Sequence, residues 1–138
     1  MYVGRAHCIR NHPGYRCHLV LLNSGIAAAC IAIYASNEFG VKALFMSTFF
    51  HGHFNDMLAG VVLLAYANLL ATLAHQPRLE FRSPVKALVL VLVAGLYWEE
   101  IAPLYTTSTA DPWDLLAYVG GGLVYVLISV LFERRWTM

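Results

Sequence analysis

The sequence predicts an all-α, polytopic integral membrane protein with four transmembrane helices and a short interfacial or re-entrant helix between the first two. Hydrophobic residues make up 59% of its 138 residues and charged residues only 12%, which leaves too little polar surface to cover a soluble globule of this size. Four apolar runs approach the length that crosses ~30 Å of hydrocarbon at ~1.5 Å per helical residue. We therefore expect a single membrane domain over residues 1–138.

The first span lies near the amino-terminal end of the sequence. Residues 1–18 are polar, contain a Pro-Gly turn at Pro13 and Gly14, and are expected to form a cytoplasmic lead. Residues 19–36 are apolar and uncharged and form the first predicted span. Small residues recur there at every fourth position, which favours close packing against another helix. These residues are Ser24, Ala28, Ala32 and Ser36.

Residues 37–54 form the predicted interfacial segment, because their apolar stretch is too short to span and starts beside Glu38 and Lys42. The second predicted span covers residues 55–74. Asp56 opens this span and shares one helix face with a stripe of small residues, so its carboxylate is expected to point into the bundle. The stripe consists of Gly60, Ala67, Ala71 and Ala74.

The second half of the sequence contains two further spans. In order, it is divided into a cytoplasmic turn at 75–84, a third span at 85–102, an outer acidic loop at 103–113, a fourth span at 114–132 and a cytoplasmic tail at 133–138. Asp111 is a candidate cap for the last helix, and Pro112 follows it at the first helical position, where proline is favoured.

The basic residues predict the orientation. With the amino terminus in the cytoplasm, Lys42 is the only one of nine Lys and Arg residues that falls outside, as the positive-inside rule requires. Both termini are then cytoplasmic, which is typical of a multi-pass protein of a bacterial inner membrane. The net charge of +1 predicts no nucleic-acid partner, since phosphate binding needs clustered basic residues.

Acidic residues gather at the predicted outer face. The stretch from Trp98 to Asp114 contains four carboxylates and no Lys or Arg. Carboxylates close to hydrocarbon are costly and usually have a partner or a task. The predicted ligand-binding residues are Trp98, Glu99, Asp111, Asp114 and Asp56. Glu99 and Glu100 are ~100° apart on a helix, so only one of them is expected to face the bundle.

Two imidazoles at the same face suggest a divalent cation site. Oxygen ligands suit Mg²⁺ or Ca²⁺, and added imidazole suits Zn²⁺ or Mn²⁺. The candidate metal ligands are His51, His53, Asp56, Glu99 and Asp114. Two other readings remain open at this stage: the aspartates are helix caps and the histidines are interfacial, or the acids transfer protons.

Residues 99–121 resemble the VanZ-like membrane proteins. Glu99, Asp111, Asp114 and Gly121 match that family's motif, whereas its usual Gln, Arg and Asn fall on Ala102, Ser108 and Tyr118. The resemblance implies a small four-helix envelope protein linked to resistance to glycopeptide antibiotics.

Two function classes follow from these observations. In the first, an outward-facing acidic pocket binds a lipid head group, an envelope precursor or an amphiphilic drug. In the second, a membrane enzyme uses a carboxylate-bound metal to act on a phospholipid or polyprenyl phosphate, with His51 or His53 as general base. A proton-coupled carrier is a third possibility and would require a homo-oligomer, because four helices enclose little space.

Overall fold

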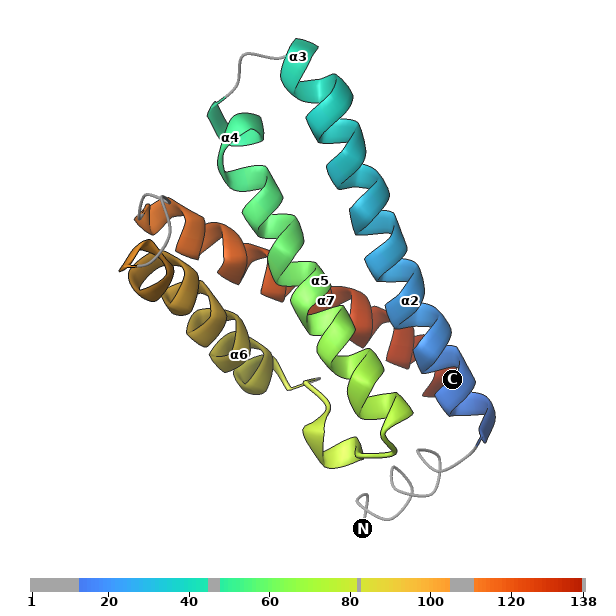
Figure 1. Ribbon diagram of the computed structural model, residues 1–138. Helices are drawn as coiled ribbons and strands as arrows, with labels where there is room; N and C mark the ends of the chain where they lie inside the picture. The colour runs from blue at the N-terminus through green and yellow to red at the C-terminus, as the bar shows by residue number, and fades with distance from the viewer. Residues whose placement is uncertain (1–12, 45–47, 82, 105–110, 138) are drawn as a thin grey trace.

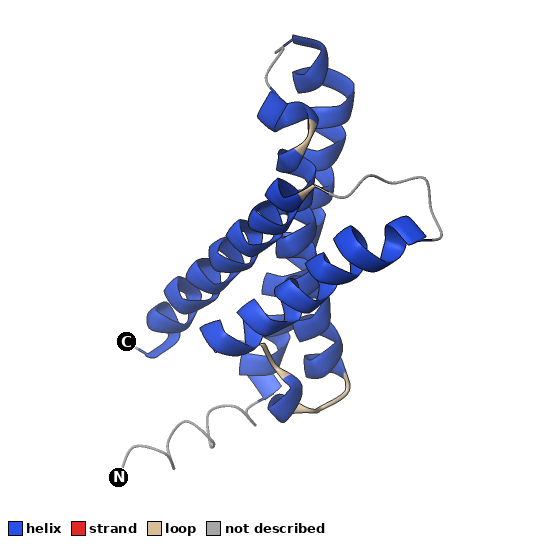
Figure 2. Cartoon of the chain, turned by 90° about the vertical axis from the view of Figure 1, so that its left-hand side faces the viewer, coloured by secondary structure: helices blue, strands red, loops and turns tan. Residues whose placement is uncertain are grey.

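The computed structural model describes residues 13–44, 48–81, 83–104 and 111–137. The described residues are almost entirely helical and contain no β-strand (Figures 1 and 2), which confirms the all-α prediction. Three helices are long and apolar enough to cross a membrane. They cover Gly14–Val41, His53–Leu73 and Pro112–Arg134.

Helix α2 (Pro13–Ser36) begins six residues before the predicted first span. The predicted turn at Pro13 and Gly14 is wrong, because Pro13 instead occupies the first helical position, where its missing N–H has no intrahelical partner to lose. Residues 13–18 of the predicted lead therefore belong to the helix. Residues 1–12 lie outside the described residues.

The predicted interfacial segment consists of short helical pieces. A π-helical turn, Asn37–Val41, continues α2 directly into α3 (Lys42–Leu44). The short helix α4 (Thr48–His51) follows, and Gly52 separates it from the next long helix. Residues 45–47 lie outside the described residues.

Helix α5 (His53–Leu73) corresponds to the second predicted span within two residues. Its end is followed by His75, which has a positive φ of 58°, in the left-handed region that sharply reverses a chain. A 3₁₀ turn, Pro77–Leu79, completes the connector.

Helix α6 (Pro84–Leu96) is regular for only 13 residues and continues as a second π-helical turn, Tyr97–Ile101, and a 3₁₀ turn, Ala102–Leu104. Together these elements cover the residues of the third predicted span, but α6 is not among the described helices that are long and apolar enough to cross a membrane. Residues 105–110 of the predicted loop lie outside the described residues.

Helix α7 (Pro112–Thr137) starts where the sequence predicts. It continues past residue 132, so the predicted tail is helical through Thr137 rather than a separate segment.

Helix α5 is the centre of the bundle. It packs on α2 and on α7, and α7 also packs on α6; α7 crosses obliquely behind α5 in Figure 1. The crossing is close because glycines face backbone: a Cβ at Gly60 would collide with the Tyr118 carbonyl, and one at Gly121 with the Met57 carbonyl. Small residues at a crossing are how membrane helices approach closely, so Gly60 acts as the predicted stripe requires.

Among the described residues, no helix packs on the small-residue face of α2. Ser24, Ala28, Ala32 and Ser36 are all exposed, so the close packing predicted for this stripe is not made by the described part of this chain. The buried face of α2 instead carries Leu19, Asn23 and Cys30. Asn23 determines which face of α2 is buried, because a buried amide needs hydrogen-bond partners that lipid does not offer.

Those partners form a buried polar network in the middle of the bundle. The Tyr125 hydroxyl donates to Asn23 Oδ1 at 2.7 Å and accepts from Asn68 Nδ2 at 2.7 Å. Asn68 Oδ1 in turn accepts from the backbone N–H of Phe81 at 2.7 Å. The network therefore joins α2, α5, α7 and the connector before α6.

Candidate functional site

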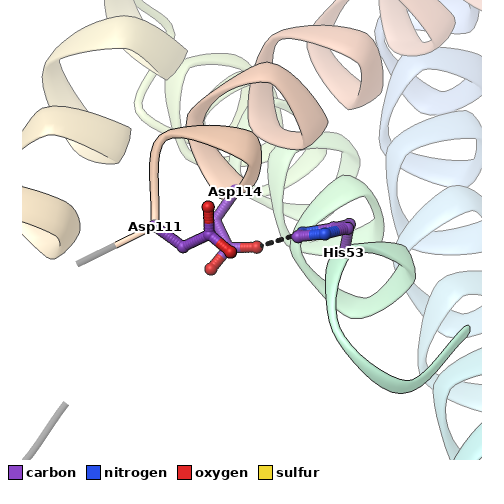
Figure 3. Close-up of side chains that lie close together, drawn as sticks. All are labelled: His53, Asp111 and Asp114. Carbon is purple, nitrogen blue, oxygen red and sulfur yellow. Dashed lines mark hydrogen bonds and ion pairs between the residues drawn. The ribbon is translucent and has the colours of Figure 1, made fainter. Parts of the chain in front are cut away.

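Three side chains from two helices converge at the end of the bundle where α5 and α7 begin. We call this end the acidic end. His53 lies in the first turn of α5, and its Nδ1 is 2.6 Å from Oδ1 of Asp114 in the first turn of α7 (Figure 3). Asp111, just before α7, turns its carboxylate toward the same place (Figure 3). One ligand atom from each of the three residues lies within 4.8 Å of the others.

Asp111 is held firmly by backbone hydrogen bonds. Its Oδ1 accepts the Trp113 N–H at 3.0 Å, which makes it the cap of α7. Its own backbone N–H donates to Glu99 Oε2 at 2.7 Å. Glu99 therefore ties the end of α6 to the start of α7 across the 105–110 segment.

Asp56 lies one turn after His53 on α5 and faces α7. Its carboxyl group interacts with the Tyr118 hydroxyl and with the Asp114 carboxyl group. Two neighbouring carboxylates repel each other, so a shared proton or a bridging cation would stabilise the pair. Glu99 acts on Asp56 through its charge.

The π-helical turn Tyr97–Ile101 aims Glu99 and Glu100 differently. Glu99 is half-buried and reaches the start of α7, whereas Glu100 is exposed. The helix phase predicted that only one of the two glutamates faces the bundle; the family resemblance, not the phase, pointed to Glu99 as that residue. π-helical turns occur frequently at functional sites.

Two predicted residues stand apart from this group. His51 is exposed at the end of α4 and interacts electrostatically with Glu38 rather than joining His53. Trp98 is 54% exposed and lines an apolar groove beside Tyr118. The sequence analysis predicted that both residues lie at this end of the molecule, but it did not predict their neighbours.

A second polar cluster at this end was not foreseen. Asn37, buried in the first π-helical turn, donates to Asn55 Oδ1 and to the Phe50 carbonyl, each at 3.0 Å. Asn55 Nδ2 donates to Glu38 Oε1 at 2.6 Å, and Lys42 forms an ion pair with the same carboxylate. The sequence signal that could have revealed this cluster is the presence of consecutive polar residues at the end of an apolar run.

The charge at the acidic end is uneven. Lys42 is the only basic residue predicted on this side, and its ion pair is with Glu38. In the described part of the chain, the acids of the candidate site form no ion pair with Lys or Arg. Their one ion-pair partner there is His53, which pairs with Asp114. Acids this close together repel one another, so a cation from solution would stabilise the arrangement.

No protein-family model, curated protein or solved structure matches this chain.

Proposed function

We propose that the chain is a four-span inner-membrane protein with both termini cytoplasmic and the acidic end outside. Three spans are long, regular helices. For the fourth, α6 and its π-helical turn run without a break from Pro84 to Ile101, roughly 25 Å at ~1.5 Å per residue. Arg78 and Lys86 lie at the opposite end from the acids, as the positive-inside rule would have it.

We propose further that the acidic end binds one divalent cation and, through it, the polar head of an amphiphile. The observation that supports this is the convergence of His53, Asp111 and Asp114 within 4.8 Å. One imidazole and two carboxylates form a mixed donor set, which favours Mn²⁺ or Zn²⁺ over Mg²⁺ and Ca²⁺. On binding, the ion would replace the hydrogen bond between His53 and Asp114.

Metal binding to protein purified in detergent tests this proposal. After treatment with EDTA, one Mn²⁺ per chain should bind, as followed by the loss of the free-ion signal in electron paramagnetic resonance. His53→Gln should weaken binding about tenfold or more, since disturbing even an outer partner of a metal ligand costs 10–100-fold. His51→Gln is the matched control and should bind like the unaltered protein. Equal binding by both variants would remove His53 from the site.

The second candidate function is a metal-dependent enzyme acting on a phospholipid or polyprenyl phosphate. In this case carboxylates alone would hold the ion and His53 would stay free of it. One observation favours it: the contact between His53 Nδ1 and Asp114 leaves Nε2 as the nitrogen that would accept a proton from water. Phosphorus NMR of Mn²⁺-loaded protein with phosphatidylglycerol tests it. Release of a new phosphate species that His53→Gln abolishes supports the enzyme, and an unchanged spectrum supports the binding protein.

The VanZ-like resemblance of residues 99–121 remains a proposal. It is compatible with the binding-protein function, since Glu99, Asp111 and Asp114, which match the family's motif, belong to the acidic end of this chain. The link to glycopeptide resistance is tested by measuring the glycopeptide sensitivity of a susceptible host that expresses the chain.

A further inference from the structure

An apolar groove opens beside the acidic end. It has a volume of about 320 Å³, at the lower end of the ~300–1,000 Å³ of ligand pockets. Its walls come from the second and third turns of α5, from Ala94 of α6 and from Trp98. Tyr118 of α7 lies between these walls, and Tyr66 lies farther along α5.

The groove lies next to the candidate metal site, and two residues of its wall connect the two. Tyr118 lines the groove and interacts with Asp56, which in turn interacts with Asp114. Trp98 lines the groove next to Glu99 in the sequence, and Glu99 is bonded to Asp111. A molecule with a polar head and an apolar chain would therefore meet the site and the groove together.

The number of ligands leaves room for a phosphate on the ion. His53, Asp111 and Asp114 offer three ligand atoms, whereas Mn²⁺ and similar ions take more. In protein sites with few carboxylates, phosphate oxygens commonly complete the coordination. Among the described residues, no Lys or Arg forms an ion pair with Asp111, Asp114 or Glu99, so a phosphate would be held through the cation and not by a basic side chain of these acids.

The charge of the site restricts the head group further. A divalent ion beside Asp111, Asp114 and Glu99 leaves the site negative, and an anionic head group would add to this excess. A primary ammonium would offset it and would donate hydrogen bonds to the carboxylates. A zwitterionic head with both groups fits better than a purely anionic one.

We infer that the acidic end and its groove bind one aminophospholipid, with the phosphate on the cation, the ammonium near Glu99 and one acyl chain along Ala94, Trp98 and Tyr118. This rests on the proposed cation site. The membrane supplies such lipids at the depth of the groove, because the groove lies along the candidate span His53–Leu73.

Pulsed electron-nuclear double resonance tests the inference on the full chain in dodecyl maltoside, which contains no phosphorus. Mn²⁺-loaded protein is mixed with phosphatidylethanolamine, and ³¹P coupling to Mn²⁺ is measured. Ala94→Trp fills the groove and should abolish the coupling while Mn²⁺ stays bound. Ala29→Trp, the same change at an exposed position of α2, should preserve it. Phosphatidylglycerol at the same concentration should give a weaker coupling.

The outcomes separate the two proposals. Bound Mn²⁺ without ³¹P coupling overturns the lipid inference and leaves the cation site standing. Coupling that survives Ala94→Trp removes the groove from the inference, and equal coupling with phosphatidylglycerol removes the ammonium. Failure to bind Mn²⁺ overturns the proposed function and the inference with it. Retained Mn²⁺ binding in Ala94→Trp also shows that this variant has folded.

Discussion

The Tyr125 hydroxyl on α7 donates a 2.7 Å hydrogen bond to Asn23 on α2, across 102 positions of the sequence. Both residues are only 2% exposed. The same hydroxyl accepts from Asn68, so a single oxygen satisfies two buried amides. Because lipid offers no substitute partner, this oxygen fixes how α2, α5 and α7 are rotated about their axes.

Tyr125→Phe should therefore destabilise the fold without changing its shape. The substitution leaves Asn23 Oδ1 and Asn68 Nδ2 without the hydroxyl, and we expect the free energy of unfolding to fall by about 1–2 kcal/mol. Unfolding in mixed micelles, followed by circular dichroism, measures it. Tyr34→Phe removes an exposed hydroxyl and should change little; an equal loss in both variants would contradict the network's role.

Two adjacent glycines should respond oppositely to alanine. Gly121→Ala places a methyl group against the Met57 carbonyl, where backbone cannot yield easily, and overpacking of this kind costs about 1–3 kcal/mol. At Gly120 nothing lies within 4 Å of the added methyl, so Gly120→Ala should be neutral or stabilising by up to ~1 kcal/mol. The difference in unfolding free energy between these variants tests the α5–α7 crossing directly. Equal stability would contradict it.

The proposed four-span topology predicts which end of α6 is accessible from outside. In a variant with Cys8, Cys17 and Cys30 replaced by serine, a cysteine at Leu104 should react with a membrane-impermeant maleimide in spheroplasts. A cysteine at Ser83 should react only after permeabilisation. Both positions are exposed in the structure, so burial does not bias the comparison. Labelling of both from one side would mean that α6 does not cross the membrane.

Asp111 has two roles that substitutions can separate. Asparagine caps a helix about as well as aspartate, so Asp111→Asn should keep the stability of α7 while weakening Mn²⁺ binding through the lost charge. Asp111→Ala should weaken Mn²⁺ binding and also cost about 1 kcal/mol in unfolding free energy. Thermal unfolding and Mn²⁺ titration of both variants measure the two effects. Unchanged Mn²⁺ affinity in Asp111→Asn would show that this carboxylate is only a cap.

Cation binding should also be visible as added stability. A ligand that binds only the folded state stabilises it by about 2.7 kcal/mol at 100 times its Kd. We expect Mn²⁺ to raise the melting temperature of the unaltered protein and of His51→Gln, and EDTA to reverse the rise. His53→Gln should show little response at the same Mn²⁺ concentration. A rise of equal size in His53→Gln would place the ion elsewhere.

The helices were largely predictable, because apolar runs in a membrane have few alternatives to helix. The structure confirms α5 within two residues and the start of α7 at Pro112. The buried face of α2 was not predictable: the four-residue spacing of small residues is a local signal, whereas the burial of Asn23 depends on Tyr125 far along the chain.

The candidate site was predictable in its location but not in its contacts. The basic residues and the helix order bring His53 and Asp114 to one end. Their 2.6 Å contact depends on how α7 crosses α5, and this is set by Gly60 and Gly121, where no charge pattern gives a signal. The π-helical turns also lack a local signature, so the reach of Glu99 to Asp111 followed only from the structure.

The π-helical turn Tyr97–Ile101 makes the acidic end sensitive to the number of residues as well as to their identity. Such a turn holds one residue more than an α-helical turn that follows the same path. Deleting one residue from it would restore α-helical geometry and keep the residues after it in the same rotational phase. An insertion or deletion elsewhere in α6 would instead rotate everything after it by ~100° and turn Glu99 away from the start of α7.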